Sequence, residues 1–299
     1  MLSKSVKIMF GVARVPFLAL VPACVLLGTA TAHFQKAMIL PSDLAASFLM
    51  WLLAHISVNS FNEYFDFKSG LDLHTTATPF SGGSKTLPNN PKEAGLGLLT
   101  ALGSLSGVLI LGVYFVVAKG LLFLPFLLFA VVLITTYTEY LTRSAFLCLI
   151  APGLGFGPVM VMGTHYILSG SYSWLAFFVS LVPFFLVSDL LLLNQFPDVE
   201  ADKKAGRKHL IISDGRGAGV KVYILFLILP FALLLAGNLS GLLPFRSLIG
   251  LLPAVLLIPL IRGVVRNNTS NTGLIPYMAM NVLVNILTPL LLALGLFIS

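Results

Sequence analysis

The sequence predicts an all-α, polytopic membrane protein, and its composition is the first reason. Of the 299 residues, 58% are hydrophobic and only 10% are charged, whereas soluble domains carry about 25% charged residues. The mean hydropathy is +0.98. A soluble fold of this length could not bury so much apolar surface, and the same numbers exclude a disordered chain. Nine apolar stretches near the 20 residues that cross a bilayer are the second reason.

These stretches follow one another along the whole chain, so we expect a single transmembrane domain over residues 1–299. The segment 2–32 also permits another interpretation, a signal peptide cleaved after Ala30-Thr31-Ala32. Its apolar stretch is long for a signal peptide, and cleavage would break the count of nine, which favours a span. The expected spans are 14–34, 42–62, 94–117, 121–141, 145–168, 173–195, 219–237, 246–265 and 273–298.

Basic residues are distributed unevenly between the two ends of these spans. The N-terminus and the loops after spans two, four, six and eight hold 15 of the 18 lysines and arginines. The other end holds only Lys36, Lys119 and Arg246. Basic residues accumulate on cytoplasmic loops, so we expect an integral membrane protein, in the inner membrane if the cell is bacterial, with its N-terminus and polar loops in the cytoplasm.

The same rule accounts for the formal net charge of +7. Nucleic-acid binding is therefore not predicted, although a basic balance is one of its signals. The two cysteines, Cys24 and Cys148, both lie in apolar stretches. They indicate neither a disulfide framework nor a cysteine-based metal site.

Two segments at the cytoplasmic ends of spans are unusually polar, 62–85 and 194–208, and together they hold six of the eleven acidic residues. In the first segment, Asn62 and Asp66 are four residues apart, so they share one face of a helix. Asp72 would point away on a continuous helix. Gly70 offers a place to end the helix and bring Asp72 back.

In the second segment, Asn194, Asp198 and Asp202 are spaced by four and four, which places them in one polar stripe. Pro197 cannot donate an amide hydrogen to the carbonyl of Leu193, so a break or kink is predicted there. Polar groups beside a broken helix at membrane depth are tolerated where they line a cavity. We therefore expect a cavity at the cytoplasmic end of the bundle.

The Asn and Asp side chains of these two polar segments are suited to a diphosphate bridged by Mg²⁺, because this ion binds through one or two carboxylates plus phosphate oxygens. Acids at span ends are costly and usually functional. For Lys203, Lys204 and Lys208, solvated loop charges are an interpretation at least as good as binding of the diphosphate. The expected metal ligands are Asn62, Asp66, Asp72, Asn194, Asp198 and Asp202. The candidate cations for the diphosphate are Lys68, Lys85, Arg143, Lys203 and Arg207.

At these residues the sequence resembles the UbiA superfamily of intramembrane aromatic prenyltransferases. That family has nine spans around a central cavity, an Asn-x-x-x-Asp motif with a further Asp after span two, and Asp-x-x-x-Asp after span six. The resemblance covers nearly the whole chain. The first motif is matched by Asn62, Asp66 and Asp72, and the second by Asn194, Asp198 and Asp202.

Three details resemble the branch that acts on 1,4-dihydroxy-2-naphthoate in menaquinone synthesis. Asp72 follows Asp66 by six residues, not four; the turn Lys-Ser-Gly-Leu-Asp precedes a Gly-Gly-Ser-Lys loop; and an Asn stands four residues before Asp198. Two departures are Glu63, where an Asp is more usual, and the run Gln-Phe-Pro at 195–197. They leave 4-hydroxybenzoate or another quinone or lipid precursor open as the acceptor.

The resemblance implies Mg²⁺-dependent prenyl transfer, in which the metal and cations draw charge onto the departing diphosphate and the aromatic ring attacks the allylic cation. Dihydroxynaphthoate would then lose its carboxylate. Asp66 and Asp198 would be catalytic through the metal. Tyr137, at the end of span four, resembles a family Tyr that precedes a basic residue, here Arg143. The implied substrate-binding residues are Asn62, Lys68, Lys85, Tyr137, Arg143, Asn194, Lys203 and Arg207.

Asp189 lies inside span six, where an acid is a functional candidate by default. It could hold an acceptor hydroxyl or act as a base, and a structural pairing with another buried polar group is an equal alternative. A secondary transporter is the main rival function, since transporters also contain broken helices. Acids at the cytoplasmic span ends favour an amphiphilic substrate instead. A membrane phosphotransferase is disfavoured because its Asp-Gly and Ala-Arg signature is absent.

Overall fold

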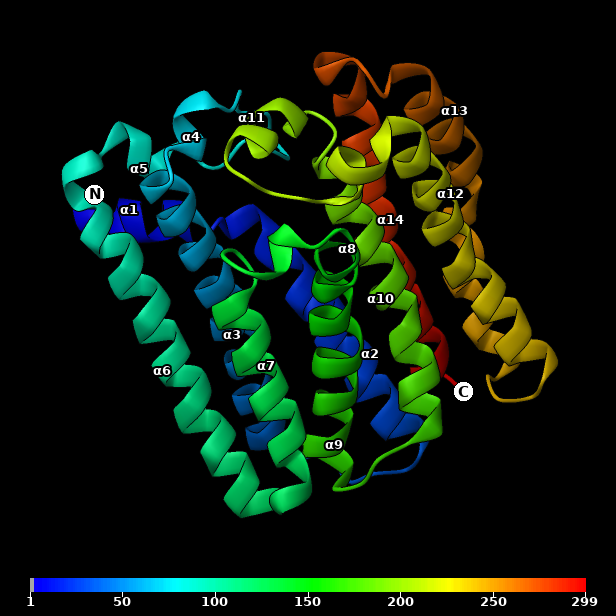
Figure 1. Ribbon diagram of the computed structural model, residues 1–299. Coiled ribbons are helices and arrows are strands. Elements are labelled where there is room, and N and C mark those ends of the chain that lie inside the picture. The colour runs from blue at the N-terminus through cyan, green and yellow to red at the C-terminus, as the bar shows by residue number, and fades with distance from the viewer. Residues whose placement is uncertain (1–2) are drawn as a thin grey trace.

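The computed structural model describes residues 3–299, so Met1 and Leu2 of the expected domain lie outside the description. The described chain is a bundle of helices without strands (Figure 1). Among residues 3–299, eight helical segments are long and apolar enough to cross a bilayer. They are Val15–Phe34 (containing α2, Leu20–Phe34), α3 (Pro41–Lys68), Pro91–Lys119 (containing α6, Ala94–Lys119), Ala145–Ser169, α10 (Trp174–Asn194), α12 (Leu210–Leu239), Phe245–Asn267 (ending in α13, Leu257–Asn267) and α14 (Asn271–Phe297).

The segment expected as a span over 121–141 is a shorter helix. A turn at Leu121–Phe123 leads into α7 (Leu124–Thr136), and together they form an apolar helix at Leu121–Thr136. At 1.5 Å per residue such a helix is about 24 Å long, less than the ~30 Å core of a bilayer. The chain leaves α-helical geometry after Thr136 and turns through Leu141–Arg143. Within the described residues, eight helices rather than nine therefore meet the length of a span.

Prolines and glycines reshape the helical segment Ala145–Ser169. It comprises α8 (Ala145–Leu154), a π-helical stretch at Gly155–Met162 and α9 (Gly163–Ser169). Pro152 and Pro158 each remove a backbone donor, which favours such a departure from α-helical bonding. A Cβ at Gly153 would lie 2.1 Å from the carbonyl oxygen of Phe184. Glycine at this position therefore lets α8 approach the backbone of α10.

Both helix ends predicted from the sequence are confirmed. Gly70 has a φ of 77° and separates α3 from the short α4 (Leu71–His74). α10 ends at Asn194, before Pro197, and α11 begins at Val199 (Val199–Lys204). Two more short helices, α1 (Lys4–Val12) and α5 (Thr86–Asn89), lie with α4 and α11 at one end of the bundle (Figure 1).

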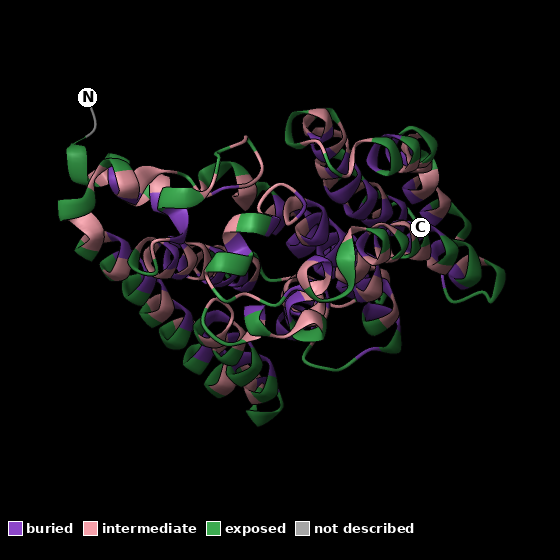
Figure 2. Ribbon diagram, turned by 45° about the horizontal axis from the view of Figure 1, so that its top comes forward, coloured by how far each residue is buried: buried purple, intermediate pink, exposed green. Residues whose placement is uncertain are grey.

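The core lies among the long helices, while their outer faces stay apolar and exposed. Figure 2 shows buried residues inside the bundle and exposed residues along the outer helices. Ile110, Val117 and Leu239 are 70%, 82% and 88% exposed, which suits contact with lipid and not with water. Helix α2 packs against α3, α9, α10 and α14. Cleavage after Ala32, the disfavoured alternative for segment 2–32, would thus remove most of a central helix.

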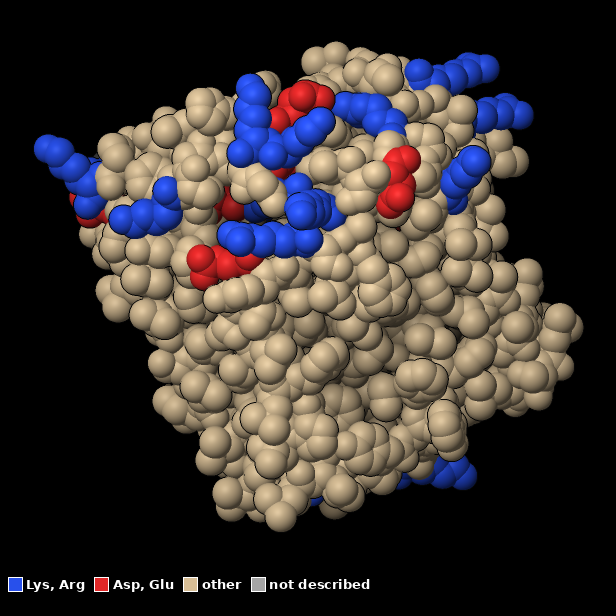
Figure 3. Space-filling model, viewed as in Figure 1, with Lys and Arg blue, Asp and Glu red and all other residues tan. Residues whose placement is uncertain are grey.

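Charged side chains gather at the end of the bundle that carries the short helices (Figure 3). A few basic side chains are visible at the opposite end, and the surface between is uncharged in this view. The N-terminal helix lies at the charged end (Figure 1). The two polar segments of the sequence therefore meet at one end of the fold.

Candidate active site

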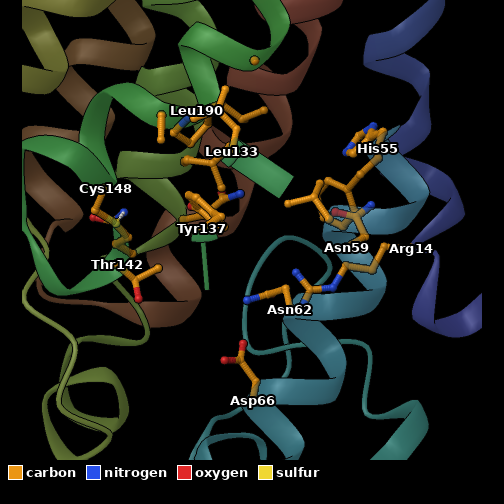
Figure 4. A pocket seen from close by; sticks show the side chains of 18 of the residues that line it. Arg14, His55, Asn59, Asn62, Asp66, Leu133, Tyr137, Thr142, Cys148 and Leu190 are labelled. Carbon is orange, nitrogen blue, oxygen red and sulfur yellow. Dashed lines mark hydrogen bonds between the residues drawn. The ribbon is translucent and has the colours of Figure 1, made fainter. Parts of the chain in front are cut away.

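A cavity of about 240 Å³ opens at the charged end, between α3 on one side and α7, α8 and α10 on the other (Figure 4). The structure brings all six expected metal ligands to its wall, although they come from four separate helices or turns. These residues are Asn62 and Asp66 on α3, Asp72 on α4, Asn194 at the end of α10, and Asp198 and Asp202 at α11.

A glycine-containing loop joins the two motifs. The backbone N–H of Gly82 donates a hydrogen bond to Oδ2 of Asp198 at 2.9 Å. Gly82 and Gly83 have φ values of 79° and 74°, which favour glycine. A Cβ at Gly83 would lie 2.5 Å from Oδ1 of Asp72. The loop can therefore lie against both acids only because these positions carry no side chain.

Arg207 connects the two motifs a second time. Its Nη1 donates to Oδ1 of Asp202 at 2.9 Å, and its Nη2 donates to Oδ1 of Asp66. Burial alone would lower the pKa of Arg207, but the charges of Asp66 and Asp202 outweigh burial and raise it. His209 Nε2 lies 3.2 Å from Oδ2 of Asp202. Arg207 is thus a fixed cation between carboxylates from opposite sides of the cavity.

The remaining acids lack a comparable partner. Burial, together with the charges of Asp66 and Glu63, raises the pKa of Asp72 to about 7. Burial and the charge of Asp202 raise the pKa of Asp198 to about 7. A raised carboxyl pKa means that the negative charge is poorly compensated. The site therefore favours an additional cation.

The oxygens at the cavity wall fit Mg²⁺ as that cation. Oδ2 of Asp72 and Oδ1 of Asn194 are buried without a hydrogen-bond partner. Carboxylate and amide oxygens are hard ligands of the kind that Mg²⁺ takes. Among residues 3–299, no three Asp, Glu, His or Cys side chains converge into a ready-made metal site. Mg²⁺ usually binds through one or two carboxylates and completes its coordination with waters and substrate phosphate oxygens.

A second polar network, missed by the sequence reasoning, supports the loop from beside the cavity. Arg14 Nε donates to Oε1 of Glu63 at 2.6 Å, and Ser84 donates to the two carboxylate oxygens of Glu63 through its N–H and hydroxyl. Arg14 lines the cavity. Its burial would lower the pKa of Arg14, but Glu63 raises it. The sequence feature that could have predicted this network is Glu63 beside the first motif, because a carboxylate at the end of a span needs a cationic partner.

The comparisons with known proteins agree with this geometry. The model of the UbiA prenyltransferase family matches residues 18–283. The chain belongs to this family. A 1,4-dihydroxy-2-naphthoate octaprenyltransferase from Bacillus subtilis (strain 168) is 31% identical over 199 residues, which are 66% of this chain and 62% of the relative. The match thus spans less than two thirds of that relative's length.

Solved structures share the fold across nearly the whole chain. Digeranylgeranylglyceryl phosphate synthase superposes with a TM-score of 0.66 at 14% identity, covering 99% of this chain and 100% of the other. A UbiA homologue from Archaeoglobus fulgidus, solved with GPP and Mg²⁺ bound, gives 0.62 at 15% identity, covering 98% and 100%. At such identities the likeness shows the UbiA fold alone.

Of the five cations expected at the diphosphate, only Arg207 lines the UbiA-type cavity in this structure. Lys85 instead donates through Nζ to the carbonyl oxygens of Asp72 at 2.5 Å and Thr75 at 2.7 Å, so it holds the loop. Lys68 lies over the ring of Tyr64, 5.8 Å from its centroid. The three side chains that are exposed and outside the lining are Lys68, Arg143 and Lys203.

Of the two other candidate residues, Tyr137 lines the cavity and Asp189 does not. Tyr137 lines the wall that faces α3, opposite Asn62 (Figure 4). Asp189 is fully buried outside the lining, where it faces Asn281 of α14 and Tyr223 of α12. Both carboxylate oxygens of Asp189 lack a hydrogen-bond partner. The structure thus keeps Asp189 outside the cavity, among neutral polar groups.

Proposed function

We propose that this UbiA-family protein transfers a prenyl group from a prenyl diphosphate to an aromatic acceptor with Mg²⁺ as cofactor. The observation that carries the proposal is the convergence of six Asn and Asp side chains from both motifs on one cavity, bridged by Arg207. The A. fulgidus homologue with GPP and Mg²⁺ supports this ligand pair. A second homologue structure contains DMAPP and Mg²⁺.

In this proposal Asp66, Asp72, Asp198 and Asp202, with Asn62 and Asn194, would hold Mg²⁺ against the diphosphate. The bound metal supplies charge stabilisation to the departing diphosphate. Arg207 contributes a fixed positive charge that needs no reorganisation during the reaction, which is the most effective kind of electrostatic stabilisation. Below the polar end, apolar walls from α3, α7 and α8 would hold the prenyl chain and exclude water from the allylic cation.

The proposed acceptor is 1,4-dihydroxy-2-naphthoate, prenylated with loss of carbon dioxide in menaquinone synthesis. The B. subtilis relative is named for this acceptor, and the three sequence details of the motifs agree with it. The cavity also offers polar groups farther from its charged end than Asp66, from Asn59 and His55 on α3 and from Arg14 (Figure 4). These groups suit an acceptor that carries hydroxyls and a carboxylate. 4-Hydroxybenzoate is the alternative acceptor.

We also propose one domain over the chain, with α7 as a ninth crossing and the charged end in the cytoplasm. Helix α7 packs against α3 and α6. The excess of 15 basic residues against 3 supports the orientation. Cysteine labelling from either side of sealed vesicles, at the exposed positions Lys203 and Lys36, tests it.

The test of activity uses purified protein, Mg²⁺, a prenyl diphosphate and the two acceptors, with product mass as the readout. We expect a prenylated, decarboxylated naphthoquinol and little product from 4-hydroxybenzoate. Asp66→Ala and Asp198→Ala should abolish turnover, since each removes a proposed metal ligand. Glu200→Ala is the matched control, because Glu200 is an exposed acid beside Asp198. Product from another acceptor alone would refute the menaquinone assignment, and near-normal turnover in both Asp variants would refute the metal site.

A further inference from the structure

One acidic side chain lies inside the bundle, away from the cavity, and has no countercharge. Asp189 of α10 is fully buried, and no ion pair among residues 3–299 includes it. Both of its carboxyl oxygens lack a hydrogen-bond partner. An ionised carboxylate is very costly in such surroundings unless a cation compensates it. The surroundings of Asp189 therefore favour a neutral, protonated carboxyl group.

Two unpartnered donors face this carboxyl group from two other helices. They are the side-chain amide of Asn281 on α14 and the hydroxyl of Tyr223 on α12, and both residues are fully buried. Neither Nδ2 of Asn281 nor the hydroxyl of Tyr223 has a hydrogen-bond partner. A small rotation of these side chains joins each of them to an oxygen of Asp189, and buried polar groups are almost always paired in this way.

The helix that carries Tyr223 also contacts the second motif. Phe196, which lies between Asn194 and Asp198, is fully buried. A Cβ at Gly219 of α12 would lie 3.2 Å from Cζ of Phe196, so the ring packs on the backbone of this helix. Gly219 is about one helical turn before Tyr223. The position of α12 relative to α10 therefore sets where the chain between the two motif residues lies.

The helix that carries Asn281 contacts the next residue of the same segment. At the start of α14, Nδ2 of Asn271 donates to the carbonyl oxygen of Pro197 at 3.4 Å. Asn281 follows ten residues later, about 15 Å along the helix. Asp189 itself precedes Asn194 by five residues, about 7.5 Å along α10. The three helices that meet at Asp189 thus also hold the run Gln-Phe-Pro at 195–197, directly before Asp198.

We propose that Asp189 is a positioning residue, a neutral carboxyl group that joins α10 to α12 and α14 and so holds the second motif at the cavity. This inference rests on the proposed function, because it takes Asn194, Asp198 and Asp202 as metal ligands. One oxygen of the carboxyl group accepts a hydrogen bond from the amide of Asn281, and the other donates its proton to the hydroxyl oxygen of Tyr223. This role needs no contact with substrate, which agrees with the place of Asp189 outside the lining.

Three substitutions separate hydrogen bonding from charge and volume. Asp189→Asn keeps an acceptor and a donor in nearly the same volume and is always neutral, so it should preserve the contact between the helices. Asp189→Leu fills the space but leaves Asn281 and Tyr223 without partners. Tyr223→Phe removes one hydroxyl and keeps the ring, so it tests the same contact if Asp189→Leu fails to fold.

The experiment measures binding of geranyl diphosphate in a Mg²⁺ titration without acceptor. Asp189→Leu should raise the Mg²⁺ concentration for half-maximal binding about tenfold, which corresponds to ~1.4 kcal/mol, because it removes two interhelical hydrogen bonds. Tyr223→Phe should raise it about threefold, since it removes one, and Asp189→Asn should change it by less than about twofold. A residue that only stabilised the bundle would lower the unfolding temperature and leave this Mg²⁺ concentration unchanged.

Tyr166→Phe is the matched control. Tyr166 of α9 is also buried, and its hydroxyl donates to the carbonyl oxygen of Lys119 at 3.2 Å, outside the cavity lining. The substitution therefore removes one hydrogen bond from a buried tyrosine that does not contact the second motif. We expect it to lower the unfolding temperature about as much as Tyr223→Phe does, with no effect on the Mg²⁺ titration.

Infrared spectroscopy tests the protonation state of Asp189 without any ligand. A protonated carboxyl group has a C=O stretching band above the amide I band, and this band shifts in D₂O. The spectra are recorded at alkaline pH, where Asp72 and Asp198, whose pKa values are raised to about 7, are ionised. The difference spectrum between wild type and Asp189→Asn should contain the band of the protonated carboxyl group.

Each outcome bears on one of the two proposals or on both. Equal losses of binding in Asp189→Asn and Asp189→Leu would show that the negative charge is needed and would overturn the neutral contact, as would a difference spectrum without the band. Wild-type Mg²⁺ curves in Asp189→Leu and Tyr223→Phe would overturn the positioning role. The expected curves without turnover on any acceptor would support this role and refute the proposed transferase function. Failure of the wild-type protein to bind geranyl diphosphate with Mg²⁺ would overturn both.

Discussion

Replacing Arg207 tests the junction between the two motifs. In Arg207→Gln the cavity loses the hydrogen bonds to Asp202 at 2.9 Å and to Asp66, and two buried carboxylates lose their cation. Removing one partner of a buried ion pair costs ~3–5 kcal/mol, so the variant should unfold at a lower temperature. A charge-assisted hydrogen bond contributes roughly 1.5–3 kcal/mol. If half of that acts on the departing diphosphate, kcat falls by about three- to tenfold for each bond.

Arg207→Lys separates geometry from charge. It restores one positive charge but not the planar fork that reaches both carboxylates, so it should recover part of the stability and less of kcat. Lys208→Gln is the matched control, because Lys208 is an exposed neighbour of the same formal charge. The measurements are prenyl-transfer kinetics at saturating Mg²⁺ and thermal unfolding of the purified protein. Wild-type kinetics and stability in Arg207→Gln would refute the bridging role, and so would equal losses in Lys208→Gln.

Two further predictions concern the loop that joins the motifs. Gly83→Ala should raise the Mg²⁺ concentration needed for half-maximal activity about tenfold, because its Cβ would lie 2.5 Å from Oδ1 of Asp72 and φ is 74°. A Mg²⁺ titration checks this against Gly95→Ala, where a Cβ meets nothing within 4 Å; equal curves would contradict it. Lys85→Met should lower turnover about tenfold, since it loses hydrogen bonds that hold the loop, whereas Lys68→Met should not. Steady-state kinetics of both variants test this prediction. Equal turnover rates in Lys85→Met and Lys68→Met would show that Lys85 is only a solvated loop charge.

Local features of the sequence determined most of the fold. Apolar stretches of span length located eight long helices, because burial of apolar residues in a bilayer requires about 20 of them in a row. Gly70 and Pro197 located the ends of α3 and α10, since each acts on its own backbone. The Asn and Asp spacings identified the family that the match over 18–283 shows. The exception is α7, which ends early where the chain turns after Thr136.

The tertiary structure decided which polar side chains meet. Arg207 and Asp66 are 141 residues apart in the sequence yet share a hydrogen bond, and no local pattern distinguishes Arg207 from the exposed Lys203 and Arg143. Asp189, an equally suggestive acid, faces neutral groups outside the cavity. Helical periodicity and hydropathy describe each helix by itself. The direction in which a side chain faces between helices depends on their packing, and here that packing selects the residues of the site.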